Sequence, residues 1–309
     1  MLVKLIEDYR EDKMIVVFDA ARENFRNEIY PEYKANRGDA PDDLIPQFPL
    51  IRECVKSFNI PQLEIEGFEA DDLIATYVNL AEKDKIETII VSSDKDLMQL
   101  VSKHVTMLDP MKNKKIEIKD VEEKFGVQPD KVIFIQALTG DKVDNIPGAP
   151  GIGPKTALQL IADYGDVHNL IKNASKITQE KRRNAIIDNK DDILISLQLV
   201  KLKNDIDLTL NIADIHTYSS TDNNNKLSDF LSNQGFKSIA ERLKNNSFIK
   251  KNNSEKIKEK KTENKYVLIN KIEKLDKLIN LIKKTGFFAI DTETNSLNIE
   301  QASLVGISI

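Results

Sequence analysis

The stretch QLEIEGFEADDLIATYVNLAEKD, residues 62–84, joins a predicted short strand, QLEIE, to a predicted helix and crowds acids where they meet. Glu69, Asp71 and Asp72 follow the strand and begin the helix, where Glu69 and Asp72 can share one face. Residues 66–72 contain no Lys or Arg. Like charges this close either stay solvated or share a cation, so the stretch predicts both a β–α unit and a site for a positive charge.

The same alternation of strand and helix continues on both sides of this stretch. Strands are expected over MIVVFDA, ETIIVSSD and VTMLD, with helices over residues 1–12 and 42–58 and a helical turn over KDLMQLV. Alternating elements with β-branched strands predict an α/β fold with a mainly parallel central sheet and covering helices, over residues 1–117. Residues 118–245 carry almost only helical signals and are expected to form a helical region.

Acidic residues recur where the predicted strands end. Asp19 follows IVVF, and Asp94 and Asp96 follow TIIV, two residues apart in extended chain and therefore on the same side. Ligands of open α/β sheets bind beyond the carboxyl ends of the strands, so these groups are aimed at one rim. Asp141 and Asp144, spaced i, i+3, are expected to lie together on a helical turn.

A single acid at a strand end or helix start is commonly a cap, but a cap needs only one carboxylate. Four groups of acids are better explained by hard oxygen ligands for Mg²⁺ or Mn²⁺, and paired ions about 4 Å apart are the standard device for phosphodiester hydrolysis. The candidate catalytic metal ligands are Asp19, Glu69, Asp71, Asp72, Asp94, Asp96, Asp141 and Asp144.

A glycine-rich turn, GAPGIGPKT at residues 148–156, has nearly the spacing of a nucleotide-binding P-loop. Pro154 separates Gly153 from Lys155, whereas the P-loop needs Gly-Lys adjacent, and the preceding segment is helical; an NTPase is therefore not expected. The better reading is a helix–hairpin–helix type of turn. There the amides of Gly151 and Gly153, with Lys155, would face a DNA phosphate ahead of the next helix.

A basic and aromatic segment, FRNEIYPEYKANR at residues 25–37, interleaves Arg26, Lys34 and Arg37 with two tyrosines. This mixture suits a single strand or flap that passes near the metal ions. The formal net charge of −5 does not exclude DNA binding, because a basic face can coexist with an acidic total.

The single cysteine, Cys54, is expected to be a small buried core residue and cannot form an internal disulfide. No signal peptide and no apolar run near 18 residues is present, which predicts a soluble, cytoplasmic protein without a membrane partner.

A change of composition marks the end of the helical region. Residues 245–265 hold seven lysines and three glutamates with almost no apolar residues, which predicts a disordered linker over 246–265; a DNA-contacting arm is the alternative. Residues 266–309 then show strand, amphipathic helix, strand, turn and strand, typical of the beginning of a second α/β domain.

Five motifs occur in one order: FDA, FRNEIYPEYKANR, EGFEADD, VSSDKDLMQLV and TGDKVDNIPGAPGIGPKTA. Together they resemble, over residues 1–245, the 5′-nuclease domain of bacterial DNA polymerases I, of the flap-endonuclease family with its PIN-like fold. The resemblance implies a monomeric two-metal 5′→3′ exonuclease and structure-specific endonuclease. It would act on 5′ ends and flaps of DNA in replication and repair, at the nucleoid. By position it implies that the eight acids hold the metals, that Arg26, Lys34 and Arg37 handle substrate, and that Gly151, Gly153 and Lys155 bind duplex.

The segment FFAIDTETNSL, near the C-terminus, resembles the first motif of the 3′→5′ proofreading exonuclease of the same polymerases, with Asp291 and Glu293 as implied metal ligands. The 5′-nuclease pattern also opens with a strand that carries one more metal-binding Asp, whereas this chain begins inside the next helix and ends on LVGISI. We therefore expect a piece cut at both ends. The alternative hypothesis is a DNA-binding fragment that lacks hydrolysis because that Asp is missing.

Overall fold

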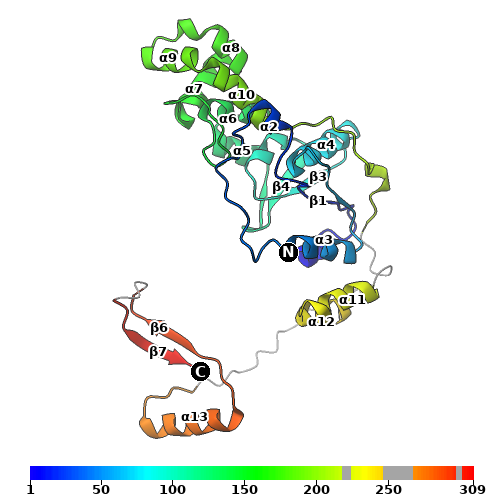
Figure 1. Ribbon diagram of the computed structural model, residues 1–309, viewed down its shortest axis with the longest axis vertical. Helices are drawn as coiled ribbons and strands as arrows, with labels where there is room; N and C mark the ends of the chain where they lie inside the picture. Colours follow the sequence, from blue (N-terminus) through cyan, green and yellow to red (C-terminus); the bar gives the residue numbers. More distant parts are fainter. Residues whose placement is uncertain (218–223, 246–266, 297–300) are drawn as a thin grey trace. The chain divides into compact units, whose positions relative to one another are not determined.

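A computed structural model describes residues 1–217, 224–245, 267–296 and 301–309. The chain divides into two compact units, residues 1–249 and residues 250–309 (Figure 1). The predicted linker, residues 246–265, lies outside the described residues. In the described ranges, no helix is both long and apolar enough to cross a bilayer.

The strands of the first unit form two small sheets. Strand β1 (Val16–Val17) pairs in parallel with β2 (Gln62–Leu63). Strand β3 (Thr88–Val91) pairs in parallel with β4 (Val105–Asp109), whose other edge carries the antiparallel β5 (Lys114–Ile116). The predicted strands are therefore present and mainly parallel, but in the described residues they do not join into the one central sheet that the sequence predicts.

The ladder between β1 and β2 is short because the chain leaves it at Asp19. The backbone bonds from Val16 to Pro61 and from Phe18 to Leu63 close the pair at both ends. The next side chain, Asp19, turns to accept a hydrogen bond from the backbone N–H of Ala70 at 2.7 Å. The strand thus ends just before Asp19, whose carboxylate binds the start of α4 instead of continuing the ladder.

Helices surround these strands and were mostly predicted. They are α1 (Leu2–Asp8), α2 (Phe25–Ile29), α3 (Gln47–Ser57), α4 (Ala70–Lys83) and the 3-10 turn η1 (Asp96–Leu100). Helix α4 begins at the acidic junction, where the Asp72 carboxylate accepts a bond from the backbone N–H of Glu69, and it buries Leu73 and Tyr77 against the core. Acids in its first turn also favour its dipole.

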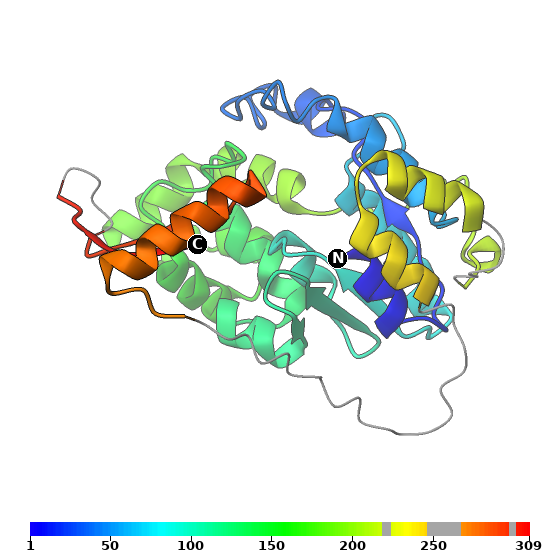
Figure 2. The ribbon, with the colours of Figure 1, turned by 90° about the horizontal axis from the view of Figure 1, so that it is seen from below.

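The rest of the first unit is almost entirely helical, as predicted. Its elements are α5 (Ile118–Phe125), η2 (Pro129–Lys131), α6 (Val132–Thr139), α7 (Pro154–Tyr164), α8 (Val167–Lys172), η3 (Ala174–Lys176), α9 (Glu180–Asp188), α10 (Lys190–Val200), η4 (Ile212–Asp214), α11 (Asn224–Asn233) and α12 (Lys237–Asn245). Figure 2 shows the green helices α6–α10 beside the blue and cyan strands and helices of the first part of the chain.

One hydrophobic core runs through both parts of this unit. It contains Ile90 of β3, Met107 of β4, Leu138 of α6, Leu160 of α7 and Leu199 of α10. Because the strands and helices share this core, the loops between them are held in fixed positions at their common border, which is where the acids lie.

A smaller cluster joins α11 to the start of the chain, with Phe230 packed among Ile6, Val55 and Phe58. Cys54 lies at the edge of this cluster and is only partly buried, so the predicted full burial of its thiol is corrected.

The second unit contains helix α13 (Ile272–Thr285) and the antiparallel strands β6 (Asp291–Thr294) and β7 (Leu304–Ser308). The strand predicted at its start is not found over residues 267–270. Val267 and Leu268 are 71% and 77% exposed, so no packed neighbour holds that segment extended. Asp291 and Glu293 both lie on β6 and are exposed.

Candidate active site

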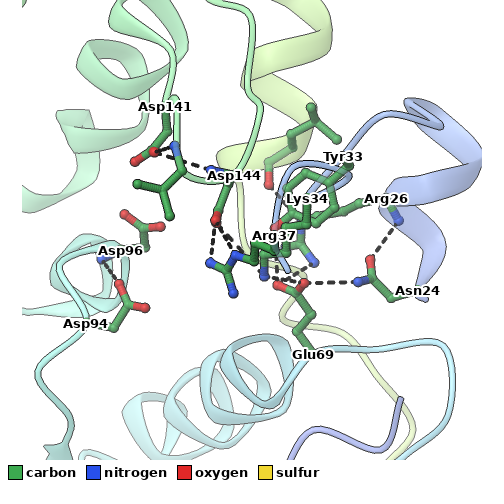
Figure 3. Close-up of polar contacts among 12 residues, drawn as sticks. Asn24, Arg26, Tyr33, Lys34, Arg37, Glu69, Asp94, Asp96, Asp141 and Asp144 are labelled. Carbon is green, nitrogen blue, oxygen red and sulfur yellow. Dashed lines mark hydrogen bonds and ion pairs between the residues drawn. The ribbon is translucent and has the colours of Figure 1, made fainter. Parts of the chain in front are cut away.

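Acidic side chains from four segments meet at the border between strands and helices. They come from the end of β1, the start of α4, the turn after β3 and the loop between α6 and α7. Figure 3 shows Glu69, Asp94, Asp96, Asp141 and Asp144 around a common space. The sequence therefore predicted correctly that the strand ends are gathered on one side.

Asp71, in the first turn of α4, interacts electrostatically with acids of three segments. Burial raises its pKa to about 7, and the negative charges of Asp94, Glu69 and Asp19 act in the same direction. Burial disfavours the charged form of a carboxyl group, and neighbouring carboxylates add to that effect. Four of the predicted ligands, from three segments, are thus electrostatic neighbours.

Asp94 and Asp96 are held by a tight turn after β3. Ser92 Oγ accepts a bond from the Asp94 backbone N–H at 3.0 Å, and Asp94 Oδ1 accepts one from the Asp96 N–H at 2.9 Å. Burial, and then the charge of Asp94, raise the pKa of Asp96 above its ordinary value. Asp141 acts on Asp96 in the same sense, which places the loop after α6 beside this turn.

That loop, residues 140–148, is a closed turn rather than the helical turn that the i, i+3 spacing predicts. Asp141 and Ile146 exchange backbone hydrogen bonds of 3.0 and 2.7 Å. A Cβ on Gly148 would lie 2.4 Å from the backbone nitrogen of Gly140, so the ends of the loop touch. Ser196 of α10 accepts a bond from the Gly148 N–H at 2.9 Å. Asp141 and Asp144 are still neighbours, because their loop is closed.

The basic segment after α2 lies directly against these acids. Lys34 Nζ donates to Glu69 Oε1 at 2.6 Å and lies 3.9 Å from Asp144 Oδ2, and Arg37 donates to Asp144 Oδ1. The backbone N–H of Lys34 also donates to the Asp144 carbonyl. Lys34 has a left-handed φ of 56°, an uncommon conformation for a residue with a side chain. The predicted substrate-handling residues Lys34 and Arg37 therefore touch the acids themselves.

Arg26 and Asp72 are corrections to the predicted site. The guanidinium of Arg26 donates to both Asp72 oxygens at 2.7 Å, and the two side chains are 1% and 0% exposed. Burial works against the charge, yet the bonds with Asp72 keep the pKa of Arg26 above its ordinary value. A buried arginine cannot contact DNA, and a carboxylate with both oxygens on that arginine does not face the rim.

The donor set fits a hard divalent cation, because it consists of carboxylates whose mutual repulsion a cation would relieve. In the part of the chain that the structure describes, however, no three acidic, histidine or cysteine side chains are already arranged to hold a metal ion. Cationic side chains are bound to several of the acids instead: Lys34 to Glu69, Arg37 to Asp144 and Lys95 to Asp141.

The glycine turn lies at the start of α7. Gly151 and Gly153 are exposed with no atom within 4 Å of the place where a Cβ would be, while Ile152 between them is buried and anchors the turn. Lys155 is exposed in the first turn of the helix. The backbone at this turn is thus open to a ligand, as a phosphate contact requires.

Several contacts of the acids were not predicted. Tyr33 and Asn24 donate to Glu69 at 3.3 and 2.9 Å, Lys95 binds Asp141, and Gln136 of α6 donates to Asp96. Lys95 stands between two predicted ligands in the sequence, and Gln136 interrupts the apolar run IFIQALT. The sequence could therefore have indicated Lys95 and Gln136 as neighbours of the acids, whereas no sequence pattern links Asn24 to Glu69.

Comparison with known proteins is consistent with this architecture. Residues 1–126 match the model of the 5′-3′ exonuclease N-terminal resolvase-like domain, and residues 127–224 match the 5′-3′ exonuclease C-terminal SAM fold. The described fold is accordingly an α/β domain followed by a helical domain.

Two curated relatives and one solved structure show the extent of the similarity. DNA polymerase I of Rhizobium leguminosarum is 48% identical over 250 residues, 79% of this chain and 24% of that protein. A 5′-3′ exonuclease of Aquifex aeolicus is 43% identical over 215 residues, 70% of this chain and 73% of that protein. The bacteriophage T5 flap endonuclease, in a complex with DNA and metal ions, superposes with a TM-score of 0.58 at 25% identity, covering 74% of this chain and 87% of that one.

The chain spans about a quarter of the length of the polymerase, so the similarity concerns one part of that protein. The two domain models together cover more than half of the chain in the expected order. The chain belongs to the 5′-3′ exonuclease family.

Proposed function

We propose that the first unit is a divalent-metal-dependent nuclease that hydrolyses phosphodiester bonds in DNA with 5′ ends or flaps. The observation that carries this proposal is the gathering of acids from separate segments around a common space (Figure 3). Burial, and then the charges of Asp94, Glu69 and Asp19, raise the pKa of Asp71 to about 7. A divalent cation bound there would relieve the repulsion between these carboxylates.

The residues proposed to hold two Mg²⁺ or Mn²⁺ ions are Asp19, Glu69, Asp71, Asp94, Asp96, Asp141 and Asp144. When bound, such ions activate a water molecule and stabilise negative charge on the phosphate. The protein supplies the fixed geometry, through the closed loop 140–148 and the turn after β3.

Lys34 and Arg37 are proposed to exchange partners during the reaction. They now neutralise Glu69 and Asp144, and cations that bind those acids would release both side chains toward the substrate phosphates. Tyr33, whose hydroxyl lies 3.3 Å from Glu69, would fix that carboxylate during the exchange.

The turn before α7 is proposed to bind duplex away from the acids. The open backbone at Gly151 and Gly153 and the exposed Lys155 suit a phosphate contact at a helix N-terminus, which is independent of base sequence.

For the second unit we propose that Asp291 and Glu293, two residues apart on β6, are part of a 3′→5′ exonuclease site. In the cell the chain would act as a monomeric part of a DNA polymerase I, on DNA of the cytoplasmic nucleoid.

The test uses the purified chain and a labelled 5′-flap DNA, first bound in EDTA and then given Mg²⁺. Asp94→Ala is expected to lower the cleavage rate by more than about a hundredfold, beyond the range for changes outside the metal ligands. Binding in EDTA should stay normal or tighten, because a repulsive charge is removed.

The matched control is Asp163→Ala, at an exposed acid of α7, which should cleave like the parent. Equal cleavage by the Asp94 variant would remove that acid from the site. A parent chain that binds the flap in EDTA but gives no products with Mg²⁺ would instead support a DNA-binding protein without hydrolysis.

A further inference from the structure

Gln136 is a half-buried amide side chain in a mostly apolar helix. Helix α6 has the sequence VIFIQALT, and Val132, Ile135, Ala137 and Leu138 are buried in the core. A glutamine among such neighbours must find hydrogen-bond partners or stay desolvated without them.

The side chain and backbone of Gln136 connect two groups of acids. Its Nε2 donates to Asp96 Oδ1, across 40 residues of sequence. Its carbonyl accepts a bond of 2.9 Å from the N–H of Gly140, the residue before Asp141. One residue therefore aligns the turn after β3 with the loop after α6.

Asp96 lies between Asp94 and Asp141 (Figure 3), so a neutral hydrogen-bond donor can hold its carboxylate in place among negative charges. Among the described residues, Gln136 is the group that donates to its carboxylate. Gln99 also reaches Asp96, but only its backbone carbonyl, at 2.9 Å. A neutral amide can hold one oxygen of Asp96 without competing with a metal ion for the carboxylate, as a lysine would.

The other end of the same amide has no partner. Among the buried side-chain nitrogen and oxygen atoms that the structure describes, Gln136 Oε1 is the one without a hydrogen bond. A buried acceptor left alone is unfavourable, so this atom is suited to receive a donor that arrives with a ligand. Carboxylates that bind metals are themselves held by outer hydrogen bonds of this kind.

We infer that Gln136 is a positioning residue for Asp96: its Nε2 fixes the carboxylate, and its Oε1 accepts a hydrogen bond from a water ligand of a divalent cation bound beside Asp96. This inference rests on the proposed function. It concerns metal affinity and leaves DNA binding to other residues.

The experiment measures Mn²⁺ binding to the full chain without DNA, by electron paramagnetic resonance and calorimetry. Gln136→Met keeps the length of the side chain and removes both amide atoms. Its Mn²⁺ affinity should fall by about tenfold or more. The cleavage rate should recover at high Mn²⁺, with the KM for flap DNA unchanged.

Gln99→Met is the matched control, because the Gln99 amide bonds only to backbone atoms of Asp96, Val200 and Leu202. That variant should lose thermal stability in EDTA and keep the parent's Mn²⁺ affinity. If Gln136→Met does not fold, Gln136→Asn replaces it, since asparagine keeps the amide but is too short to reach Asp96.

An affinity of the folded Gln136 variant within about twofold of the parent, well below the change expected for an outer partner, would overturn the inference while the proposed function stands. An equal loss in the Gln99 variant would overturn it too, since the effect would then be one of stability. A parent chain that binds no Mn²⁺ would overturn the proposed function itself.

Discussion

Arg26 and Asp72 are 46 residues apart in the sequence and form a bidentate ion pair that is buried from solvent. Both of its nitrogen–oxygen distances are 2.7 Å. The same guanidinium donates from Nε to the Leu199 carbonyl at 2.7 Å, and Asp72 accepts a bond from the Lys203 N–H at 2.9 Å. The pair thus ties α2 and the start of α4 to the end of α10 and the segment after it. Glu69, 3.7 Å from Arg26, is positioned from the same point.

Breaking this pair should destabilise the first unit strongly. Arg26→Met leaves a buried carboxylate without its partner, which costs about 3–5 kcal/mol in the free energy of unfolding. Urea unfolding measures this loss. Arg26→Met combined with Asp72→Leu should recover much of it, because no buried charge then remains. If the Arg26→Met variant lost flap binding but kept its stability, Arg26 would instead be a DNA-binding residue, as the sequence predicted.

The stability of the metal-free protein should fall as pH rises through the range where Asp71 ionises. In the folded chain Asp71 keeps its proton up to a pKa of about 7, mainly because it is buried and secondly because Asp94 is near, whereas the unfolded chain loses that proton near the ordinary value of 3.8. The folded state therefore binds more protons between these values, and its stability decreases with pH there.

Asp71→Asn mimics the protonated form and removes this dependence. In EDTA its melting temperature should match that of the parent near pH 4 and exceed it above pH 7, by on the order of several degrees. Asp163→Asn, at an exposed position, should show no such trend. Saturating Mn²⁺ should stabilise the parent more than the Asp71 variant, and a pH-independent difference would contradict the assignment.

The closed loop 140–148 should not tolerate a side chain at Gly148. Its φ of 60° is left-handed, and an added Cβ would meet Gly140 backbone atoms from 2.4 Å. Gly148→Ala should lower the free energy of unfolding by at least about 2 kcal/mol and disturb Asp141 and Asp144.

Gly153→Ala is the control for the loop, since Gly153 has open space around it and a φ of −89°. Chemical denaturation should show this variant to be close to the parent in stability. Gly148 and Gly153, about five residues apart in one motif, would then differ for a reason visible only in the fold. Equal losses at both positions would mean that the loop is not closed as described.

Lys155→Ala should weaken duplex binding to a similar degree for every base sequence and reduce the slope of log affinity against log salt by about one unit. Filter binding over a salt series measures the slope. Lys172→Ala, at an exposed lysine at the end of α8, is the control and should leave the slope unchanged. An effect that varies with base sequence would argue against a phosphate contact.

The sequence by itself determined the order of strands and helices and the gathering of acids at strand ends. Those signals are local: the apolar run before Asp94, the acids opening α4 and the glycines before α7 each act within a few residues. The acidic residues and the direction of the strands were then enough to predict that the acids gather at one edge, because parallel strands present their carboxyl ends together.

Only the tertiary structure decided which charges meet. Arg26 and Lys34 look alike in the motif FRNEIYPEYKANR, yet one is buried on Asp72 and the other lies on Glu69 at the rim. Asp71 and Asp72 are adjacent in the chain, but Asp71 lies among the acids of the rim and Asp72 forms a buried ion pair with Arg26. The choice depends on contacts such as Arg26 with Leu199, 173 residues away, which form only when the shared core brings α2, α4 and α10 together. A helix turns each successive side chain by about 100°, so neighbouring letters face different surroundings, and packing alone selects between them.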